Sequence, residues 1–148
     1  MRRLLPVTRL APLVLLVLAA CARETSGPAE VAWDRDACER CQMLIADTPF
    51  AAQVRSAPGG RAHRFDDLGC ALLWWHEHGA DPRAEIWVRD LAGGQWIDAR
   101  TARFRAGEKS PMGYGIGASA GPAGGDLALE SALERILARE RERRSDRG

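Results

Sequence analysis

Two cysteines and a methionine lie close together in the segment Cys38-Glu39-Arg40-Cys41-Gln42-Met43. The Cys41 thiolate and the Met43 thioether are two positions apart, so an extended or turned backbone can direct both sulfur atoms at one point. Both are soft ligands, and soft sulfur ligands select Cu(I) over harder cations. A thioether cannot be deprotonated and binds Zn(II) poorly. This segment therefore favours copper over zinc.

A second methionine, Met112, follows Pro111 and precedes Gly113. Methionine most often fills gaps in a hydrophobic core, but this segment is polar and glycine-rich. We therefore predict no packing role for Met112, which makes it a further candidate for a soft metal ligand.

Two other chemistries are open to the CxxC motif. Cysteines at this spacing also occur in thiol–disulfide oxidoreductases and in zinc sites. The oxidoreductase alternative requires a buried strand before the motif and a helix after it, and residues 32–37 do not predict such a strand. The zinc alternative needs four ligands, which the CxxC pair, Cys70 and His63 supply in number. Cys70 falls on the apolar stripe of a predicted helix, so we expect a buried structural thiol there.

The N-terminus has the residue order of a bacterial lipoprotein export signal. Three arginines precede an apolar run over residues 10–18 that is too short to remain in a bilayer as a helix. The run ends at Leu18-Ala19-Ala20-Cys21, which looks like a lipobox. We predict cleavage before Cys21, lipid on its thiol, and a protein that faces the periplasm. Ala22 is not the Asp that commonly retains lipoproteins at the inner membrane, which favours the outer membrane.

The charge and the cysteine count exclude some classes of protein. The full chain has a formal net charge of +1, and residues 1–20 hold three arginines and no acid, so the predicted mature chain carries −2. This charge argues against a nucleic-acid partner. Lipid on Cys21 leaves three of the four cysteines, an odd number that cannot all pair within one chain.

Alternating apolar residues and turn signals predict short strands, at 50–56, 61–65, 85–89, 95–99, 102–105 and, as an irregular strand, 111–116. One helix is predicted from a cap at Asp66 or Asp67 to a stop at Gly79, and a second from a cap at Asp126. Beyond Ala138 the Glu- and Arg-rich chain is either solvated helix or frayed tail. These signals divide the chain into a signal peptide at 1–20, a tether at 21–32, a folded domain at 33–138 and a charged tail at 139–148.

The runs CERCQMLIADTPFAAQV, HRFDDLGC and WIDARTARFRAGEKSPMGYGIGA resemble the NosL family of copper-binding envelope lipoproteins associated with nitrous oxide reductase. The resemblance implies an α+β fold of two small ββαβ-like halves, with an antiparallel sheet and packed helices. Because the charged run follows the last helix, we expect the last strand of the second half to be missing. Gln42 stands where many members of the family have glycine.

The resemblance also implies a non-enzymatic metallochaperone that delivers Cu(I) to apo nitrous oxide reductase or to another copper acceptor. Matched residue by residue, it assigns Cys41, Met43 and Met112 as Cu(I) ligands, with Cys38 as a secondary candidate. The alternative function is a thiol–disulfide oxidoreductase that uses Cys38 and Cys41. A third is a structural lipoprotein that its cysteines merely crosslink.

Overall fold

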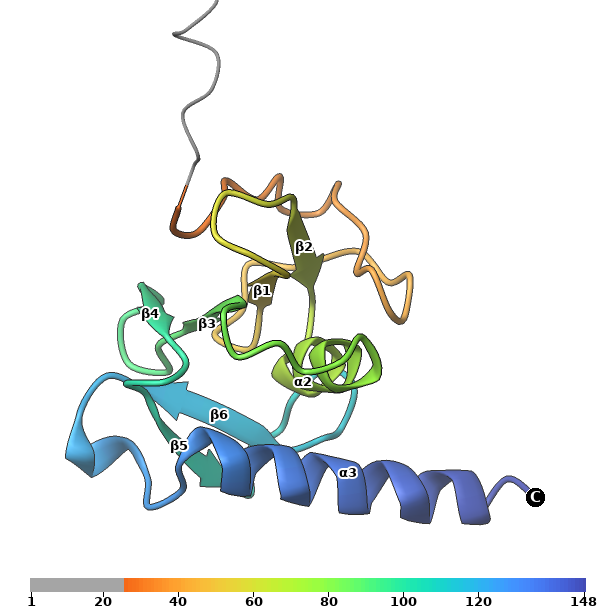
Figure 1. The fold of residues 1–148 in the computed structure, drawn as a ribbon. Helices are drawn as coiled ribbons and strands as arrows, with labels where there is room; N and C mark the ends of the chain where they lie inside the picture. The colour runs from red at the N-terminus through yellow and green to blue at the C-terminus, as the bar shows by residue number, and fades with distance from the viewer. Residues whose placement is uncertain (1–25) are drawn as a thin grey trace, which may run out of the picture.

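The computed structural model describes residues 26–148, which form two antiparallel sheets and two helices (Figure 1). The predicted signal peptide and the predicted lipidation site at Cys21 lie outside the described residues. No helix among residues 26–148 combines the length and the apolar character that crossing a membrane requires.

The larger sheet has the strand order β2-β1-β3-β4, with β1 at Ala52–Arg55, β2 at Ala62–Phe65, β3 at Glu85–Arg89 and β4 at Trp96–Asp98. The smaller sheet pairs β5 at Arg103–Ala106 with β6 at Ile116–Ser119. Helix α2 spans Leu68–Glu77, helix α3 spans Leu129–Ser145, and a short 3-10 helix, η2, spans Pro122–Gly124. The two sheets meet where the backbone N–H of Leu91 donates to the carbonyl of Ala118 at 2.8 Å.

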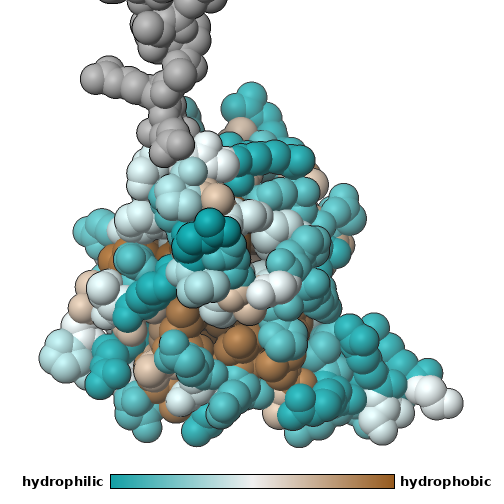
Figure 2. Space-filling view, viewed as in Figure 1, coloured by the Kyte–Doolittle hydropathy of each residue, from teal (hydrophilic) through white to brown (hydrophobic). Residues whose placement is uncertain are grey.

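One hydrophobic core lies between the sheets and the helices. Its largest fully buried side chains include Phe65 and Leu72 from the first half of the chain, and Phe104 and Ile136 from the second. On the face shown in Figure 2 the surface is mostly hydrophilic, and hydrophobic side chains show mainly in the lower part, where β5, β6 and α3 lie. Burial of apolar surface in this single core is the main stabilising contribution to the fold.

Residues 27–29, which precede the first strand, are hydrogen-bonded to the larger sheet. The Gln53 side-chain amide exchanges two hydrogen bonds of 2.8 Å with the backbone of Ala29. Arg55 Nε donates to the carbonyl of Gly27 at 2.9 Å. These contacts explain why two polar side chains of the central strand β1 are buried, because buried polar groups require hydrogen-bond partners.

The α+β fold expected from the sequence is confirmed. Strands β1 and β2, helix α2 and strand β3 form a ββαβ unit, and β5, β6 and α3 form a second unit that lacks a closing strand. Among the described residues, no strand follows α3. The chain beyond Ala138 is helical as far as Ser145, so the charged run continues the helix.

Two local predictions were wrong. The segment 111–116 is turn rather than strand until Ile116, because Gly113 and Gly115 adopt φ values of 70° and 72°, outside the strand region. Asp126 does not cap α3. The backbone of the next residue, Leu127, pairs with Phe104 in both directions, so the helix begins only after Ala128, whose side chain makes no capping bond.

Candidate metal centre

Three cysteine sulfur atoms meet beneath the loop at residues 38–43. The Sγ atoms of Cys38, Cys41 and Cys70 all lie within 4.8 Å of one another, and all three cysteines are free. Cys38 and Cys70 are buried, whereas Cys41 is half-buried and gives the cluster its access to solvent. Cys70 is buried as the sequence predicts, but its thiol joins the CxxC pair. Of the copper, zinc and redox sites considered from the sequence, only the zinc site used all three of these cysteines.

The loop that carries the CxxC motif is closed by its own backbone. The N–H of Cys38 donates to the carbonyl of Met43 at 2.8 Å, and the N–H of Gln42 donates to the carbonyl of Cys38 at 3.0 Å. Gln42 has a φ of 63°, a left-handed conformation that favours glycine. Glycine, which the resemblance stated above leads us to expect at this position, would adopt this conformation without strain. No helix follows Cys41 in this loop.

The first turn of α2 brings Cys70 to the loop. Asp67 caps this helix by accepting the backbone N–H of Gly69 at 2.7 Å, as the sequence predicted for one of the two aspartates. Gly69 is required because a Cβ atom there would lie 2.2 Å from the Tyr114 ring. Capping and this close approach together fix where the helix starts and therefore where the Cys70 thiol lies.

The three cysteines of the cluster differ in the direction in which their pKa values are shifted. The Cys70 thiol donates a hydrogen bond to the Cys38 sulfur, which lowers the pKa of Cys38 despite the opposing effect of burial. The backbone N–H groups of Cys41, Asp66 and Arg40 lower that pKa further. The pKa of Cys70 is raised because its proton is held by Cys38, and burial raises the pKa of Cys41. The shifts favour ionisation of the Cys38 thiol first, with Cys41 and Cys70 as the proton-bearing neighbours.

The sequence profile of the NosL family matches residues 30–123, a span that contains the whole cluster. The chain belongs to the NosL family. The fold is similar to the crystal structure of the copper chaperone NosL from Shewanella denitrificans, with a TM-score of 0.56 and 17% sequence identity. The similarity covers 77% of this chain and 89% of that protein. At this identity the similarity shows a shared fold. A search among curated proteins found no match.

The two methionines that the NosL resemblance assigns as ligands lie on segments bonded to the cysteine elements. The backbone N–H of Met43 is directed at the Cys41 sulfur, and the Met43 side chain is 48% exposed. The backbone N–H of Met112 donates to the Asp67 carboxylate at 2.8 Å. Met112 is partly buried against the core, so it has the packing role that its sequence context did not predict. The ligand roles of Met43 and Met112 stay predictions.

His63, counted in the zinc alternative, lies outside the cluster of this NosL-family protein. Its ring packs against Trp74 with 4.2 Å between centroids, and Trp74 also stacks on His78 at 3.9 Å. The His63 side chain is 16% exposed, and its Nδ1 lies 3.3 Å from a carboxylate oxygen of Glu39. Ring packing and this contact account for the histidine.

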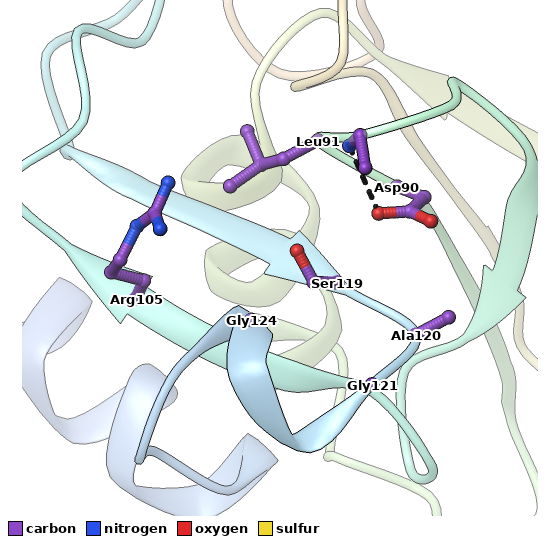
Figure 3. A pocket seen from close by; sticks show the side chains of 8 residues that line it. Asp90, Leu91, Arg105, Ser119, Ala120, Gly121 and Gly124 are labelled. Atoms are coloured by element: carbon purple, nitrogen blue, oxygen red, sulfur yellow. Dashed lines mark hydrogen bonds between the residues drawn. The ribbon is translucent and has the colours of Figure 1, made fainter.

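A separate cavity of about 380 Å³ lies away from the cysteines, between the end of β3 and the β5–β6 sheet (Figure 3). Its two charged side chains already have partners. Asp90 accepts the backbone N–H of Ala92 at 3.1 Å, and Arg105 pairs with Glu108 at 2.7 Å. The cysteine cluster is therefore the stronger candidate site.

Proposed function

We propose that this NosL-family protein is a metallochaperone that binds one Cu(I) at the cluster of Cys38, Cys41 and Cys70 and passes it to a copper enzyme. The observation that supports this proposal most directly is the meeting of three sulfur atoms within 4.8 Å. In a planar three-sulfur site with metal–sulfur bonds of about 2.3 Å, the length typical of thiolate sites, the sulfurs are about 4 Å apart. The three thiols thus stand close to the spacing that a single ion requires.

Cu(I) is the ion that this donor set suits best. The cluster offers sulfur and no imidazole or carboxylate, and soft thiolate donors select Cu(I). Zn(II) in proteins is almost always four-coordinate, so it requires a fourth donor. We propose the thioethers of the exposed Met43 and of the partly buried Met112 as additional soft neutral donors, because both residues lie on segments next to the cluster. Neutral thioethers hold Cu(I) less firmly than thiolates, which suits a protein that must release its cargo.

Loading and release both take place at Cys41. Incoming Cu(I) displaces protons from Cys41 and Cys70, while Cys38 offers a thiolate from the start. Because Cys38 and Cys70 are buried, a ligand of the acceptor protein approaches through the half-buried Cys41 and the exposed Met43. Ligand exchange at this open side passes the ion on without exposing it to water. Apo nitrous oxide reductase is the acceptor that family membership favours.

Lipid on Cys21 is the second part of the proposal. The apolar run that ends at Leu18-Ala19-Ala20-Cys21 supports it. Mass spectrometry of protein extracted from membranes is expected to find a chain that begins at acylated Cys21, in the outer membrane and facing the periplasm. Soluble protein with an unmodified Cys21 would contradict this part and leave the copper proposal standing.

The decisive experiment is a competition titration of the reduced mature chain against a chromogenic Cu(I) chelator. We expect about one Cu(I) per chain and far weaker Zn(II) binding. Cys38→Ser, Cys41→Ser and Cys70→Ser should each weaken Cu(I) binding strongly. Met43→Leu and Met112→Leu should weaken it less and barely change stability, because Leu is close to Met in volume. Parent-like binding in all three serine variants would refute the site.

The rival function, a thiol–disulfide oxidoreductase, has one observation in its favour, the lowered pKa of Cys38. In such enzymes a helix after the motif commonly lowers the pKa, whereas here the Cys70 thiol does so and no helix follows Cys41. An insulin-reduction assay is expected to give no activity above buffer. Turnover that disappears in Cys38→Ser would make the oxidoreductase the better account.

A further inference from the structure

Arg40, between the two cysteines of the motif, reaches out of the cysteine loop to three other segments. Its guanidinium donates to the Tyr114 hydroxyl at 3.2 Å, to Glu77 at 3.1 Å and to Glu140 at 3.3 Å. Tyr114 belongs to the loop at residues 107–115 between β5 and β6, which we call the Met112 loop. Glu77 belongs to α2, and Glu140 belongs to α3. The Arg40 and Glu140 side chains are 19% and 17% exposed, so the bond between them is largely shielded from water, whereas Glu77 is more exposed. The cysteine loop is thereby tied to α3.

A second set of contacts ties the Met112 loop to the same end of α3. The Tyr114 hydroxyl donates to Glu140 at 2.8 Å. The Arg143 guanidinium lies 4.9 Å from the centre of the Tyr114 ring and donates to the carbonyl of Met112 at 2.8 Å. Glu140 and Arg143 therefore contact both loops that supply candidate copper ligands.

These contacts are separate from the packing that anchors α3 to the core. The buried residues of the helix are Leu129, Ala132 and Ile136, all in its first half. Beyond Leu137 the helix side chains are polar or charged apart from Ala138, and the contacts to the loops are hydrogen bonds and ion pairs. This polar half of the helix buries no apolar side chain of its own; it contacts the core at Tyr114, and it lies across two loops, so we look to it for a role besides stabilising the core.

We propose that Glu140 and Arg143 near the end of α3 position the copper site, Glu140 holding the cysteine loop through Arg40 and Arg143 holding the Met112 loop, and that these two residues set the rate at which Cu(I) leaves. This inference rests on the proposed copper function. Glu140 and Arg143 act through the loops and not as metal ligands. Holding a binding loop in its bound conformation lowers the entropic cost of binding. Once freed, the loops let Cys41 and Met112 move away from the ion, and release becomes faster.

The test compares Glu140→Ala with Glu142→Ala on the mature chain loaded with Cu(I). Glu142 is a matched control because it lies on the same helix and is largely exposed, and within residues 26–148 its one ion pair is with Arg139, at 3.5 Å. Transfer of Cu(I) to a chromogenic chelator, followed by stopped flow, gives the release rate. Glu140→Ala removes the hydrogen bonds from Arg40, Tyr114 and Arg144, and should speed release at least about tenfold, the change that the loss of a single charged hydrogen bond would give. Glu142→Ala should leave the rate within about twofold, as expected of an exposed pair.

Two further comparisons distinguish a positioning role of Glu140 and Arg143 from a general effect on protein stability. Glu140→Gln keeps an acceptor for the Tyr114 hydroxyl and should restore part of the slow release. Arg143→Ala should speed release in the parent but not in Met112→Leu, because the loop that Arg143 holds then carries no ligand. Glu140→Ala should act in both backgrounds, because it also acts through Arg40.

The outcomes distinguish this inference from the copper proposal. If the parent does not bind Cu(I), the proposed function fails. If the parent binds and Glu140→Ala and Arg143→Ala release Cu(I) at the parent rate, the positioning role is wrong and the copper site stands. A lower thermal midpoint with an unchanged release rate would also refute positioning. Should Glu140→Ala fail to fold, Glu140→Gln and Arg143→Ala carry the same comparison, and parent-like release in both would overturn the inference.

Discussion

The buried carboxylate of Asp67 accepts a hydrogen bond from the backbone N–H of Met112, with 2.8 Å between oxygen and nitrogen. The other oxygen of the same carboxylate accepts the N–H of Gly69 at the start of α2. One side chain therefore joins the Met112 loop to the helix that carries Cys70. The two loops and the helix of the proposed copper site are linked through this carboxylate and through Arg40.

Asp67→Asn tests this link. The amide has one acceptor oxygen in place of two, so either Gly69 or Met112 loses its partner. We expect the free energy of unfolding to fall by about 1–3 kcal/mol, the cost of a buried unpaired group. Cu(I) affinity should fall as well, if Met112 is a ligand. Urea denaturation and chelator competition measure the two effects.

Asp126→Asn provides the control for that experiment. Asp126 is exposed and does not cap α3, so its replacement should change stability by no more than about 0.5 kcal/mol. Equal effects of the two substitutions would contradict the linking role of Asp67.

The number of protons released when copper binds equals the number of protonated thiols that become ligands. Cys41 and Cys70 have raised pKa values and hold their protons at neutral pH, whereas Cys38 has a lowered pKa. Binding to all three sulfurs should therefore release about two protons, and Cu(I) affinity should rise about a hundredfold for each pH unit around neutrality. Affinity is correspondingly lost as the pH falls, because protons compete with the metal.

Cys70→Ser should reduce that release to about one proton, because the serine hydroxyl still donates to Cys38 while one ionising thiol is gone. Chelator competition at several pH values gives the slope. A slope of one in the parent would mean that only one of Cys41 and Cys70 binds the metal, and a slope unchanged in Cys70→Ser would identify Cys70 as the thiol that does not.

Gly69→Ala should be strongly destabilising. The added Cβ would lie 2.2 Å from the Tyr114 ring, which packs on the first turn of α2. We expect a loss of about 1–3 kcal/mol of stability, as for overpacked cores, together with weaker Cu(I) binding. Gly121→Ala is the control, because nothing lies within 4 Å of a Cβ there and its φ of −117° suits any residue. A thermal melt of each variant is sufficient, and similar melting temperatures would show that Tyr114 yields easily.

Gln42 offers a comparison of two substitutions at one position. Gln42→Gly and Gln42→Ala both remove the side-chain bonds to the carbonyls of Cys38 and Glu39. Only alanine keeps the cost of a Cβ in the left-handed conformation, about 1 kcal/mol. The glycine variant should therefore be the more stable of the two in denaturation curves. The reverse order would mean that the loop adopts another conformation in solution.

Local sequence signals predicted most of the fold. The hairpin of β1 and β2, the cap at Asp67 and strand β3 follow from neighbouring residues, so alternation, turns and capping reveal them. The wrong cap at Asp126 has a different cause, because Leu127 pairs with Phe104 from another part of the chain. A long-range backbone pair overrides a local capping preference.

The candidate site was less accessible from the sequence. The spacing of the CxxC motif predicts that Cys38 and Cys41 lie close together. The helical periodicity around Cys70 predicts only that its thiol is buried. Whether a buried thiol faces the CxxC pair or the core depends on how α2 packs beneath the loop. The role of α3 was hidden for the same reason, because the partners of Glu140 lie in other segments.

Arg40 and Glu140 are 100 positions apart. A ribosome makes the three cysteines well before it makes the last turns of α3, so a nascent chain holds the metal-binding thiols before the residues that steady them. Closing a loop of that length has an entropic cost that is met only when the rest of the domain has formed. If Glu140 and Arg143 position the proposed site, copper that reaches such an immature chain should be held more loosely and lost more readily to competing thiols. Completion of the helix would then act as a maturation step that turns a labile thiol cluster into a carrier able to retain its ion in transit.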